Sequence, residues 1–249
     1  MTRILLSGCC GHMGRVIREI VKQRDDCEIC AGVDLVTESA EFPIYTSFDD
    51  VCETPDVVID FSHPSVLSSL LAFAHQKGNL PVVLCTTGYS AEQVEQVHQA
   101  AKELPVFYSR NMSIGINLLI GLAKKAVQVL GDDFDIEIVE QHHNQKIDAP
   151  SGTALMIADA IAAERETESR YVYDRHSQRK KREKTEIGIH SVRGGTIVGE
   201  HEVIFAGNSE VIRLSHSAQS KEVFAAGAVN AACYMNGRPA GLYDMSDLI

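Results

Sequence analysis

Arg3-Ile4-Leu5-Leu6-Ser7-Gly8-Cys9-Cys10-Gly11-His12-Met13-Gly14 is the stretch of the sequence on which the expected architecture depends. Its apolar first half predicts a short buried strand, and three glycines spaced three residues apart follow directly. Apolar residues recur at helical spacing over residues 16–21, so a helix is expected after the last glycine. Residues 28–33 predict a second strand, which ends on the acidic residue Asp34.

Strand, glycine turn, helix, strand and acid in this order are typical of a dinucleotide-binding unit. The glycines, spaced GxxGxxG rather than the commoner GxGxxG, let the backbone turn tightly and approach a pyrophosphate, which the helix N-terminus then stabilises. Asp34 follows Gly14 by twenty residues and can accept hydrogen bonds from a ribose diol. A glycine-rich turn without a ligand is the alternative interpretation.

Strand and helix patterns alternate up to residue 108. Strands are expected over residues 57–61, 82–85 and 106–108, and helices over residues 66–75 and 91–102. This order predicts a Rossmann-like, doubly wound parallel α/β sheet, in which ligands bind beyond the carboxyl ends of the strands. The residues that follow the strands there leave room for a nicotinamide ring, and they are Asp60-Phe61-Ser62, Thr86-Thr87-Gly88 and Asn111-Met112-Ser113.

The pattern changes after residue 113, where largely β material begins. Helices are expected over residues 117–130 and from residue 153, and strands over residues 135–139, 186–192, 196–205 and 209–215. An alanine-rich helix over residues 223–234 suits packing back onto the first domain. We therefore predict an inserted α+β domain, 113–221, within a dinucleotide-binding domain formed by 1–112 plus 222–249.

Two adjacent histidines, a lysine and a Pro-Ser-Gly turn stand together in Val139-Glu140-Gln141-His142-His143-Asn144-Gln145-Lys146-Ile147-Asp148-Ala149-Pro150-Ser151-Gly152-Thr153-Ala154-Leu155. Helical spacing after this stretch places Ser151 as an N-cap. His142, His143 and Lys146 are thus expected on a loop between a strand and a helix N-terminus. Exposed N–H groups and cationic side chains there suit a carboxylate or a phosphate. An ordinary polar connection with two solvated histidines is the alternative.

Bulk composition excludes several classes of protein. The net charge of −11 argues against nucleic acid as the main partner. No run approaches eighteen apolar residues and the N-terminus lacks a signal-peptide pattern, so neither a membrane span nor export is expected. The seven cysteines are odd in number and scattered, which indicates a reducing cytoplasmic location rather than a disulfide framework.

Two local patterns allow more than one interpretation. Cys27 and Cys30 have the spacing of a redox or metal half-site but lack a second pair, so two small residues flanking a strand are favoured. Residues 179–184 hold five basic residues in six, and a solvated, mobile loop is favoured there over a grip on an acidic ligand.

With these residues identified, the chain resembles the 4-hydroxy-tetrahydrodipicolinate reductases, also called dihydrodipicolinate reductases, of bacterial lysine and diaminopimelate synthesis. The resemblance runs nearly end to end. Its most specific part is Glu140-x-His142-His143-x-x-Lys146-x-Asp148-Ala149-Pro150-Ser151-Gly152-Thr153-Ala154. Supporting parts are Met13-Gly14-Arg15, Val58-Ile59-Asp60-Phe61-Ser62, Thr86-Thr87-Gly88, Asn111-Met112-Ser113-Ile114-Gly115-Ile116-Asn117, Ser191-Val192-Arg193-Gly194-Gly195 and Gly241-Leu242-Tyr243-Asp244-Met245.

The resemblance implies an activity and an assembly. Members reduce 4-hydroxy-tetrahydrodipicolinate to tetrahydrodipicolinate with loss of water, using NADH or NADPH and no metal. Their dinucleotide domain is joined to a substrate domain whose sheets assemble a homotetramer. The inserted domain of this chain is therefore expected to bind a small dicarboxylate and to form the oligomer.

The resemblance also implies roles for single residues. His142 would be the acid/base residue at the reacting ring, and Lys146 a second proton donor. His143 would contact a substrate carboxylate, which Ser151, Gly152 and Thr153 hold at the helix N-terminus. The cofactor would be lined by Gly8, Cys9, Cys10, Gly11, His12, Met13, Asp34, Cys85, Thr86, Thr87, Ser109, Arg110, Asn111 and Met112.

Some positions depart from the family pattern. Arginine is usual at His12 and Lys221, a small residue is usual at Arg110, and Cys85 replaces a glycine, which could narrow the nicotinamide pocket. Leu35 follows Asp34 where some members carry an arginine that could meet a 2′-phosphate. Because an acid without a basic neighbour repels a 2′-phosphate, we predict that NADH is favoured over NADPH.

Three other interpretations compete with this one. Another Rossmann-type dehydrogenase of an acidic, amino-acid-like substrate would share the dinucleotide half but has no need of the stretch around His142. A non-enzymatic NADH-sensing module would need an interaction segment or a basic recognition helix, and the only basic run, residues 179–184, lacks helical amphipathicity. A zinc site built from His142, His143 and Asp148 is disfavoured, because adjacent histidines on a strand point to opposite faces.

Overall fold

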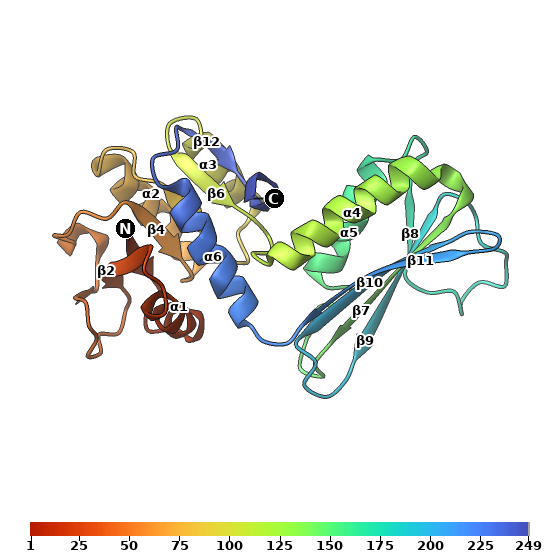
Figure 1. Ribbon diagram of the computed structural model, residues 1–249, viewed down its shortest axis with the longest axis horizontal. Coiled ribbons are helices and arrows are strands. Elements are labelled where there is room, and N and C mark those ends of the chain that lie inside the picture. The colour runs from red at the N-terminus through yellow and green to blue at the C-terminus, as the bar shows by residue number, and fades with distance from the viewer. Residues whose placement is uncertain (249) are drawn as a thin grey trace. The chain divides into compact units, whose positions relative to one another are not determined.

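The computed structural model describes residues 1–248, which form two compact units (Figure 1). The first unit consists of Met1–Ile114 together with the chain from Lys221 onward, and the second is Gly115–Ser220. The second unit is therefore an insertion between two parts of the first.

A seven-stranded sheet, with every described pairing parallel, forms the centre of the first unit. Its order is β12-β6-β5-β4-β1-β2-β3, in which β1 lies inside the sheet and the chain winds outward on both sides. This is the predicted doubly wound, Rossmann-like arrangement, and the prediction is confirmed. The strands are β1 (Thr2–Ser7), β2 (Cys27–Val33), β3 (Ile44–Tyr45), β4 (Val57–Asp60), β5 (Val82–Leu84), β6 (Pro105–Tyr108) and β12 (Gly241–Tyr243).

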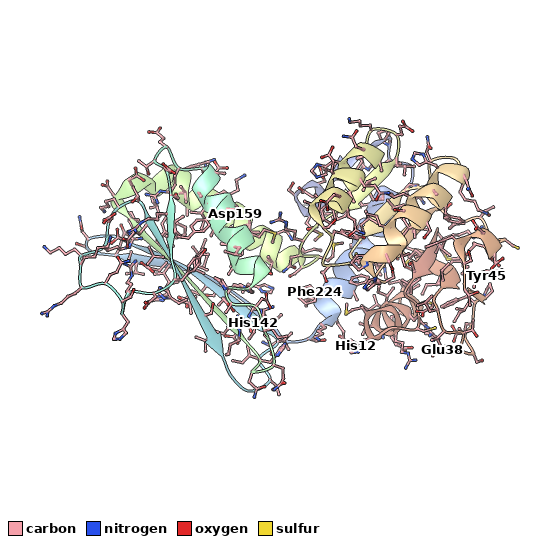
Figure 2. All side chains as sticks on the ribbon, turned by 180° about the vertical axis from the view of Figure 1, so that it is seen from behind. His12, Glu38, Tyr45, His142, Asp159 and Phe224 are labelled. Carbon is pink, nitrogen blue, oxygen red and sulfur yellow. The ribbon has the colours of Figure 1, made fainter. Side chains whose placement is uncertain are left out.

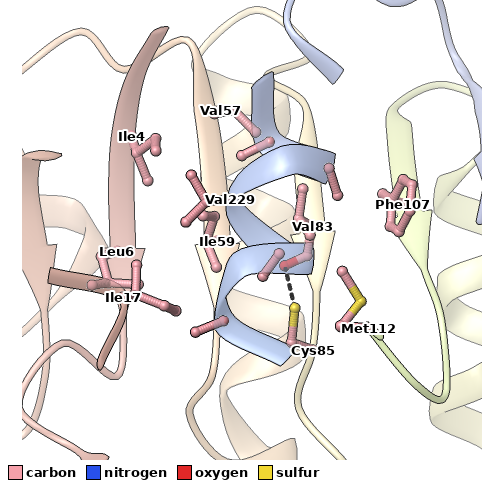
Figure 3. Close-up of a cluster of buried hydrophobic side chains, with 14 of the residues drawn as sticks. Ile4, Leu6, Ile17, Val57, Ile59, Val83, Cys85, Phe107, Met112 and Val229 are labelled. Carbon is pink, nitrogen blue, oxygen red and sulfur yellow. Dashed lines mark hydrogen bonds between the residues drawn. The ribbon is translucent and has the colours of Figure 1, made fainter. Parts of the chain in front are cut away.

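Helices cover both faces of this sheet because successive strand residues point to opposite sides. On one face, Ile4, Leu6 and Ile59 pack with α1 (His12–Lys22) and α6 (Glu222–Met235), as Figure 3 shows for Ile17 and Val229. On the other face, Leu5 and Val58 pack with α2 (Leu67–Gln76) and α3 (Ala91–Ala100). Short 3₁₀ turns complete the unit at Phe48–Asp50, Pro64–Val66 and Met245–Leu248.

The turn between β1 and α1 depends on glycine. Gly8 has φ +79°, and a Cβ atom there would lie 2.4 Å from the carbonyl oxygen of Phe61. A Cβ atom on Gly14 would lie 2.2 Å from the carbonyl oxygen of Gly8. Both positions therefore exclude any side chain. Gly8 lets the turn pass close to the end of β4, and Gly14 lets the first turn of α1 pack against Gly8 and Cys9.

The second unit is a five-stranded mixed sheet with two helices on one face. The sheet order is β11-β10-β7-β9-β8, with β7, β9 and β8 parallel to one another and β10 antiparallel to both of its neighbours. Its core joins the sheet residues Ile138 and Val203 to Leu119 and Ile157 of the helices. The elements are α4 (Ile114–Leu130), β7 (Asp135–His142), α5 (Gly152–Ala163), β8 (Arg170–Val172), β9 (Glu186–Arg193), β10 (Gly199–Ala206) and β11 (Val211–Ala218), with a 3₁₀ turn at Gly131–Asp133.

Several element bounds differ from expectation. Helix α4 begins three residues earlier than the predicted residue 117, and β10 begins at Gly199 rather than at residue 196. The short strands β3, β8 and β12 were not predicted, because two or three residues carry too little periodicity. The placement of His142 on a loop is wrong, since β7 continues to His142 and pairs with Arg193 of β9.

Within the basic stretch 179–184, the side chain of Arg182 is held by several hydrogen bonds rather than surrounded by solvent. The Arg182 guanidinium donates to the carboxylates of Glu137 and Asp135 and to the carbonyl oxygens of Ile136 and Glu186. Its side chain is 17% exposed. The expectation of a solvated loop is therefore wrong for Arg182, because acids on β7 neutralise its charge.

Helix α4 together with the following 3₁₀ turn, Ile114–Asp133, is long and apolar enough to cross a membrane by length and composition alone. A single helix of this kind is weak evidence, since core helices of other proteins pass the same test. Here Leu119, Ala123 and Val127 of α4 pack into the core of the second unit. Leu118 and Leu122 lie on its exposed side.

Candidate active site

A buried carboxylate holds the imidazole of His142 at the end of β7. The two residues are two apart on one strand, so their side chains point to the same face of the sheet. His142 Nδ1 lies 2.6 Å from Glu140 Oε2, and both side chains are buried. Because the ionised carboxylate only accepts, Nδ1–H is the donor, and Nε2 is left to exchange a proton. Figure 2 labels His142 on this strand.

Arg193 fixes Glu140 from the neighbouring strand β9. Its Nη1 and Nη2 atoms donate to Glu140 Oε2 and Oε1 at 2.8 and 2.7 Å, and Nη2 also donates to the Asp148 carbonyl oxygen at 2.7 Å. The backbone N–H of Ser151 donates to Glu140 Oε1 at 3.1 Å. Burial alone would raise the pKa of Glu140, but hydrogen bonds led by that from Arg193 hold it at about 2. Glu140 is therefore a fixed negative charge.

Burial lowers the pKa of His142 below its ordinary value of 6.5, and Glu140 partly offsets this effect. Lys146 and Arg193 lower it further by charge repulsion. The imidazole is consequently mostly neutral at pH 7.

A second histidine supports the same site. His201 on β10 lies opposite Glu140 in the sheet, and its ring meets the ring of His142 edge-on at 5.3 Å between centroids. Its Nε2 lies 3.1 Å from Ser151 Oγ. Burial lowers the pKa of His201 to about 4, so this ring stays neutral and adds no charge beside His142.

The N-terminus of α5 lies directly after the histidine stretch. Ser151 is its N-cap, as predicted, and Ser151 Oγ accepts from the N–H of Ala154 at 3.1 Å. Gly152 and Thr153 then form the first turn of the helix, whose positive dipole end favours an anion. Lys146 precedes them, and its Nζ lies 2.8 Å from Asp148 Oδ1. This part of the second unit therefore brings together a buried imidazole, an ammonium group and the N-terminus of a helix.

The first unit carries a cavity of about 630 Å³ at the glycine turn. Gly8, Cys10 and Gly11 line one side, and Asp34 lies at the end of β2. Asp34 Oδ2 accepts from the N–H of Cys10 at 2.9 Å, which fixes the carboxylate beside the turn. The cavity has the size and lining of a nucleotide site, and the absence of Cβ atoms at Gly8 and Gly14 suits close approach of a pyrophosphate.

Comparison with known proteins decides the family. Two family models match, "Dihydrodipicolinate reductase, N-terminus" over residues 2–112 and "Dihydrodipicolinate reductase, C-terminus" over residues 115–249. The chain belongs to the dihydrodipicolinate reductase family.

Full-length relatives agree with this assignment. The 4-hydroxy-tetrahydrodipicolinate reductases of Caldanaerobacter subterraneus and Clostridium novyi are 53% and 50% identical, each over all of this chain and 98% of the relative. The solved dipicolinate-bound dihydrodipicolinate reductase from Paenisporosarcina sp. is 26% identical over the whole of both chains, with a TM-score of 0.83. The predicted family and enzyme class, a nicotinamide-dependent oxidoreductase, are thus confirmed. The two alternatives, a dehydrogenase of another substrate class and a non-enzymatic NADH-sensing module, are excluded.

Several residues that the dihydrodipicolinate reductase resemblance placed at the cofactor do not line the cavity. His12 is exposed at the start of α1, and Cys9 and Met13 face the core of the first unit. Cys85 points into the core, with its Sγ 3.9 Å from the Val83 carbonyl oxygen, so its thiol does not narrow an open pocket (Figure 3). Met112 is likewise buried against α6.

The strand ends beyond the cavity form a small polar cluster. The fully buried carboxylate of Asp60 accepts from Thr86 Oγ1 at 2.6 Å and from Ser62 Oγ at 2.5 Å. Thr87, which follows Thr86, and Arg110, which follows Ser109, are exposed. Ser109 Oγ accepts from the N–H of Asn111 at 3.4 Å. The contacts of Thr86, Thr87 and residues 109–112 with the cofactor therefore remain a prediction.

Glu140 and Arg193 were predicted only as parts of motifs, without their role at His142, and His201 was not predicted at all. Glu140 could have been found, because an acid two residues before a histidine on a strand shares its face. Arg193 and His201 could not, since only the register of β7 with β9 and β10 brings them to Glu140.

Proposed function

We propose that this chain reduces 4-hydroxy-tetrahydrodipicolinate to tetrahydrodipicolinate with loss of water, in lysine and diaminopimelate biosynthesis. Family membership supports the reaction, and the observation that carries the chemistry is the buried Glu140–His142 pair next to the α5 N-terminus. The division of labour follows the two units, with the cofactor at the glycine turn and the substrate at the histidine stretch.

His142 acts as the general acid. Glu140 holds Nδ1–H, so Nε2 is the atom that delivers a proton to the ring atom on which negative charge develops. General acid catalysis of this kind typically contributes about 10²–10⁴-fold to the rate. The bound nicotinamide supplies the hydride, and Gly8, Gly11 and Asp34 would hold the dinucleotide.

Dianionic substrate is held by the groups around His142. The N–H groups of Gly152 and Thr153 and the side chain of His143 take one carboxylate, while Lys146 neutralises the ligand and donates a second proton. A nearby carboxylate raises the pKa of an imidazole, so the substrate itself converts His142 to the acid form that catalysis needs.

NADH is the favoured cofactor. Asp34 has no Lys, Arg or His within ion-pair distance in residues 1–248, and Leu35 beside it is exposed and uncharged. Arg15 lines the cavity, but it pairs with Glu38 at 2.7 Å, and Arg18 pairs with the same carboxylate. We expect kcat/KM for NADH to exceed that for NADPH by about tenfold, roughly 1.4 kcal/mol. A tenfold preference for NADPH would contradict the assignment.

The assembly and location are also proposals. We expect a cytoplasmic homotetramer formed through the second unit's sheet, whose face opposite α4 and α5 presents half-buried side chains such as Glu137, Val139 and Gln141. The predicted domain bounds are part of this proposal, with 1–112 plus 222–249 as the dinucleotide-binding domain and 113–221 as the substrate-binding and oligomerisation domain. Light scattering across a dilution series measures the mass, and a monomer at micromolar concentration would contradict it.

The activity test is direct. NADH oxidation is followed at its absorbance band in the presence of the condensation product of pyruvate and aspartate semialdehyde. Turnover with this substrate, and none with an acidic 2-oxo acid or an amino acid, is the expected result. Oxidation of NADH with the latter compounds only would overturn the substrate assignment.

Lys146→Ala is expected to raise KM for the substrate and to lower kcat, each by about tenfold or more, since removing one partner of a charge pair costs about 2–5 kcal/mol. NADH affinity should not change. Lys125→Ala, on the second unit's helix α4, is the matched control and should leave both constants unchanged. Unaltered KM in Lys146→Ala would remove this residue from the substrate site.

A further inference from the structure

We propose that the thiols of Cys9 and Cys10 and the carboxylate of Asp34 form a site for a thiophilic divalent cation, Zn²⁺ or Cd²⁺, whose occupation excludes the dinucleotide cofactor. One ligand atom from each residue lies within 4.8 Å of the other two. All three residues belong to the first unit, so the site is complete within it. The cation here is an inhibitor and not a catalytic metal.

The spacing of the two sulfur atoms already suits a metal. Cys9 Sγ and Cys10 Sγ lie 3.8 Å apart. Two thiolates bound to one zinc ion at about 2.3 Å, with the tetrahedral angle, are also separated by about 3.8 Å. Binding therefore needs no change in the distance between the two thiols.

The third ligand is fixed and free of a competing cation. Asp34 Oδ2 accepts from the N–H of Cys10 at 2.9 Å and Oδ1 accepts from the N–H of Val36 at 3.2 Å. Within residues 1–248, no Lys, Arg or His forms an ion pair with Asp34, and each oxygen keeps a further lone pair for a metal. Arg18, the cation that acts on Cys9, is bound to Glu38 at 2.5 Å.

Glycine makes the space in which Cys9 lies. A Cβ atom on Gly32 would lie 2.5 Å from Cys9 Sγ, so any other residue there would displace the thiol. Cys10 and Asp34 line the cavity at the glycine turn, whereas Cys9 is buried beneath them. The site thus has three protein ligands and one side open to solvent, where a water molecule completes four-coordination.

A second cluster in the same unit lacks these properties. Asp26, Cys27 and Cys233 also come within 4.8 Å of one another. However, the Arg24 guanidinium donates to both oxygens of Asp26 at 2.8 and 2.6 Å and lies 3.9 Å from Cys233 Sγ. A dication there would meet a positive charge already in place, so this cluster serves as an internal comparison.

Occupation of the site has a clear chemical consequence. Burial raises the pKa of Cys9 to about 12 and raises that of Cys10, so both thiols are protonated at pH 7. The cation displaces two protons, with no change in oxidation state, and Cys10 gives up its hydrogen bond to the Val36 carbonyl oxygen. The metal also occupies Asp34, the proposed acceptor of the ribose diol, and this exclusion rests on the proposed cofactor site.

The test is a Cd²⁺ titration of the full chain, reduced with a phosphine, without cofactor. The ultraviolet cadmium–thiolate charge-transfer band should saturate in the wild type and in the matched control Cys52→Ser, whose exposed thiol lies outside both clusters. Cys10→Ser and Cys9→Ser should weaken Cd²⁺ binding at least tenfold, and Cys27→Ser should not. Circular dichroism checks that each variant folds. If Cys9→Ser does not fold, the Cd²⁺ affinity of Cys10→Ser tests the proposal, because Cys10 is at a half-exposed position.

Competition with NADH gives the second readout. Saturating NADH should raise the apparent Kd for Cd²⁺, and Cd²⁺ should raise the KM for NADH without lowering kcat. An unchanged cadmium band in Cys10→Ser, or simultaneous binding of Cd²⁺ and NADH to the wild type, would overturn the proposal. If NADH does not bind at all while the thiol-dependent band forms, the proposed function fails and the metal site stands.

Discussion

His142→Ala lowers kcat by about 10²–10⁴-fold, the range that a general acid typically contributes, and leaves the Kd for NADH within about twofold of the wild type. The reason is that we propose His142 Nε2 as the proton donor, whereas the proposed nucleotide site lies in the other unit. Stopped-flow turnover and NADH fluorescence measure the two quantities. His75→Ala, an exposed histidine on α2, is the matched control and should change neither.

The pH profile of kcat/KM tests the same residue by a different route. A general acid works in its protonated form, so activity falls as pH rises through its pKa. Since burial lowers the pKa of His142 in the free protein, this fall should have its midpoint below 6.5. A wild-type fall centred well above 7, or a wild-type turnover rate in His142→Ala, would assign the proton to another group.

Glu140→Gln combines the second large effect on activity with a large effect on stability. The substitution keeps the shape of the side chain but leaves the Arg193 guanidinium without its buried anion. Breaking one side of a buried pair typically costs about 3–5 kcal/mol in the free energy of unfolding. Urea denaturation of wild type and variant measures the difference. Glu103→Gln, at an exposed position after α3, is the control and should cost at most about 0.5 kcal/mol.

The pH dependence of activity in Glu140→Gln distinguishes a role in positioning His142 and setting its pKa from a role in the fold alone. Glu140 raises the pKa of His142 against the lowering effect of burial, so its loss lowers that pKa further. The midpoint of the kcat/KM profile should therefore move to lower pH in Glu140→Gln, and kcat at pH 7 should fall about tenfold or more. A variant that is destabilised but keeps the wild-type pH profile would show that Glu140 only supports the fold.

The sequence predicted the first unit well because its signals are local. Glycines in a strand-to-helix turn and the regular alternation of strands and helices are properties of short segments, and they gave the parallel sheet with its order of elements. Ser151 as an N-cap was predicted for the same reason. The ends of the elements are marked less strongly in the sequence. Helix α4 begins at Ile114 rather than at the predicted residue 117, because its apolar first residues give no N-terminal signal.

The support of His142 could not be predicted because it is not local. Arg193 is 53 residues from Glu140, and only the parallel pairing of β7 with β9 brings its guanidinium to the carboxylate. The same holds for His201, which reaches Ser151 through the antiparallel pairing of β10 with β7. The motif residues were identified from sequence, whereas the charges that tune them come from the strand register.

The contribution of α6 to the first unit's core has a consequence for synthesis on the ribosome. Six residues of this helix lie in that core, and they are Ala225, Ala228, Val229, Ala231, Ala232 and Met235. All of them follow the inserted unit, so a nascent chain that has emerged as far as residue 220 leaves exposed the part of this sheet face that α6 covers. The inserted unit has its whole core by then and can fold first, which reverses the usual N-terminal-first order and makes a stalled or truncated chain a target for chaperones.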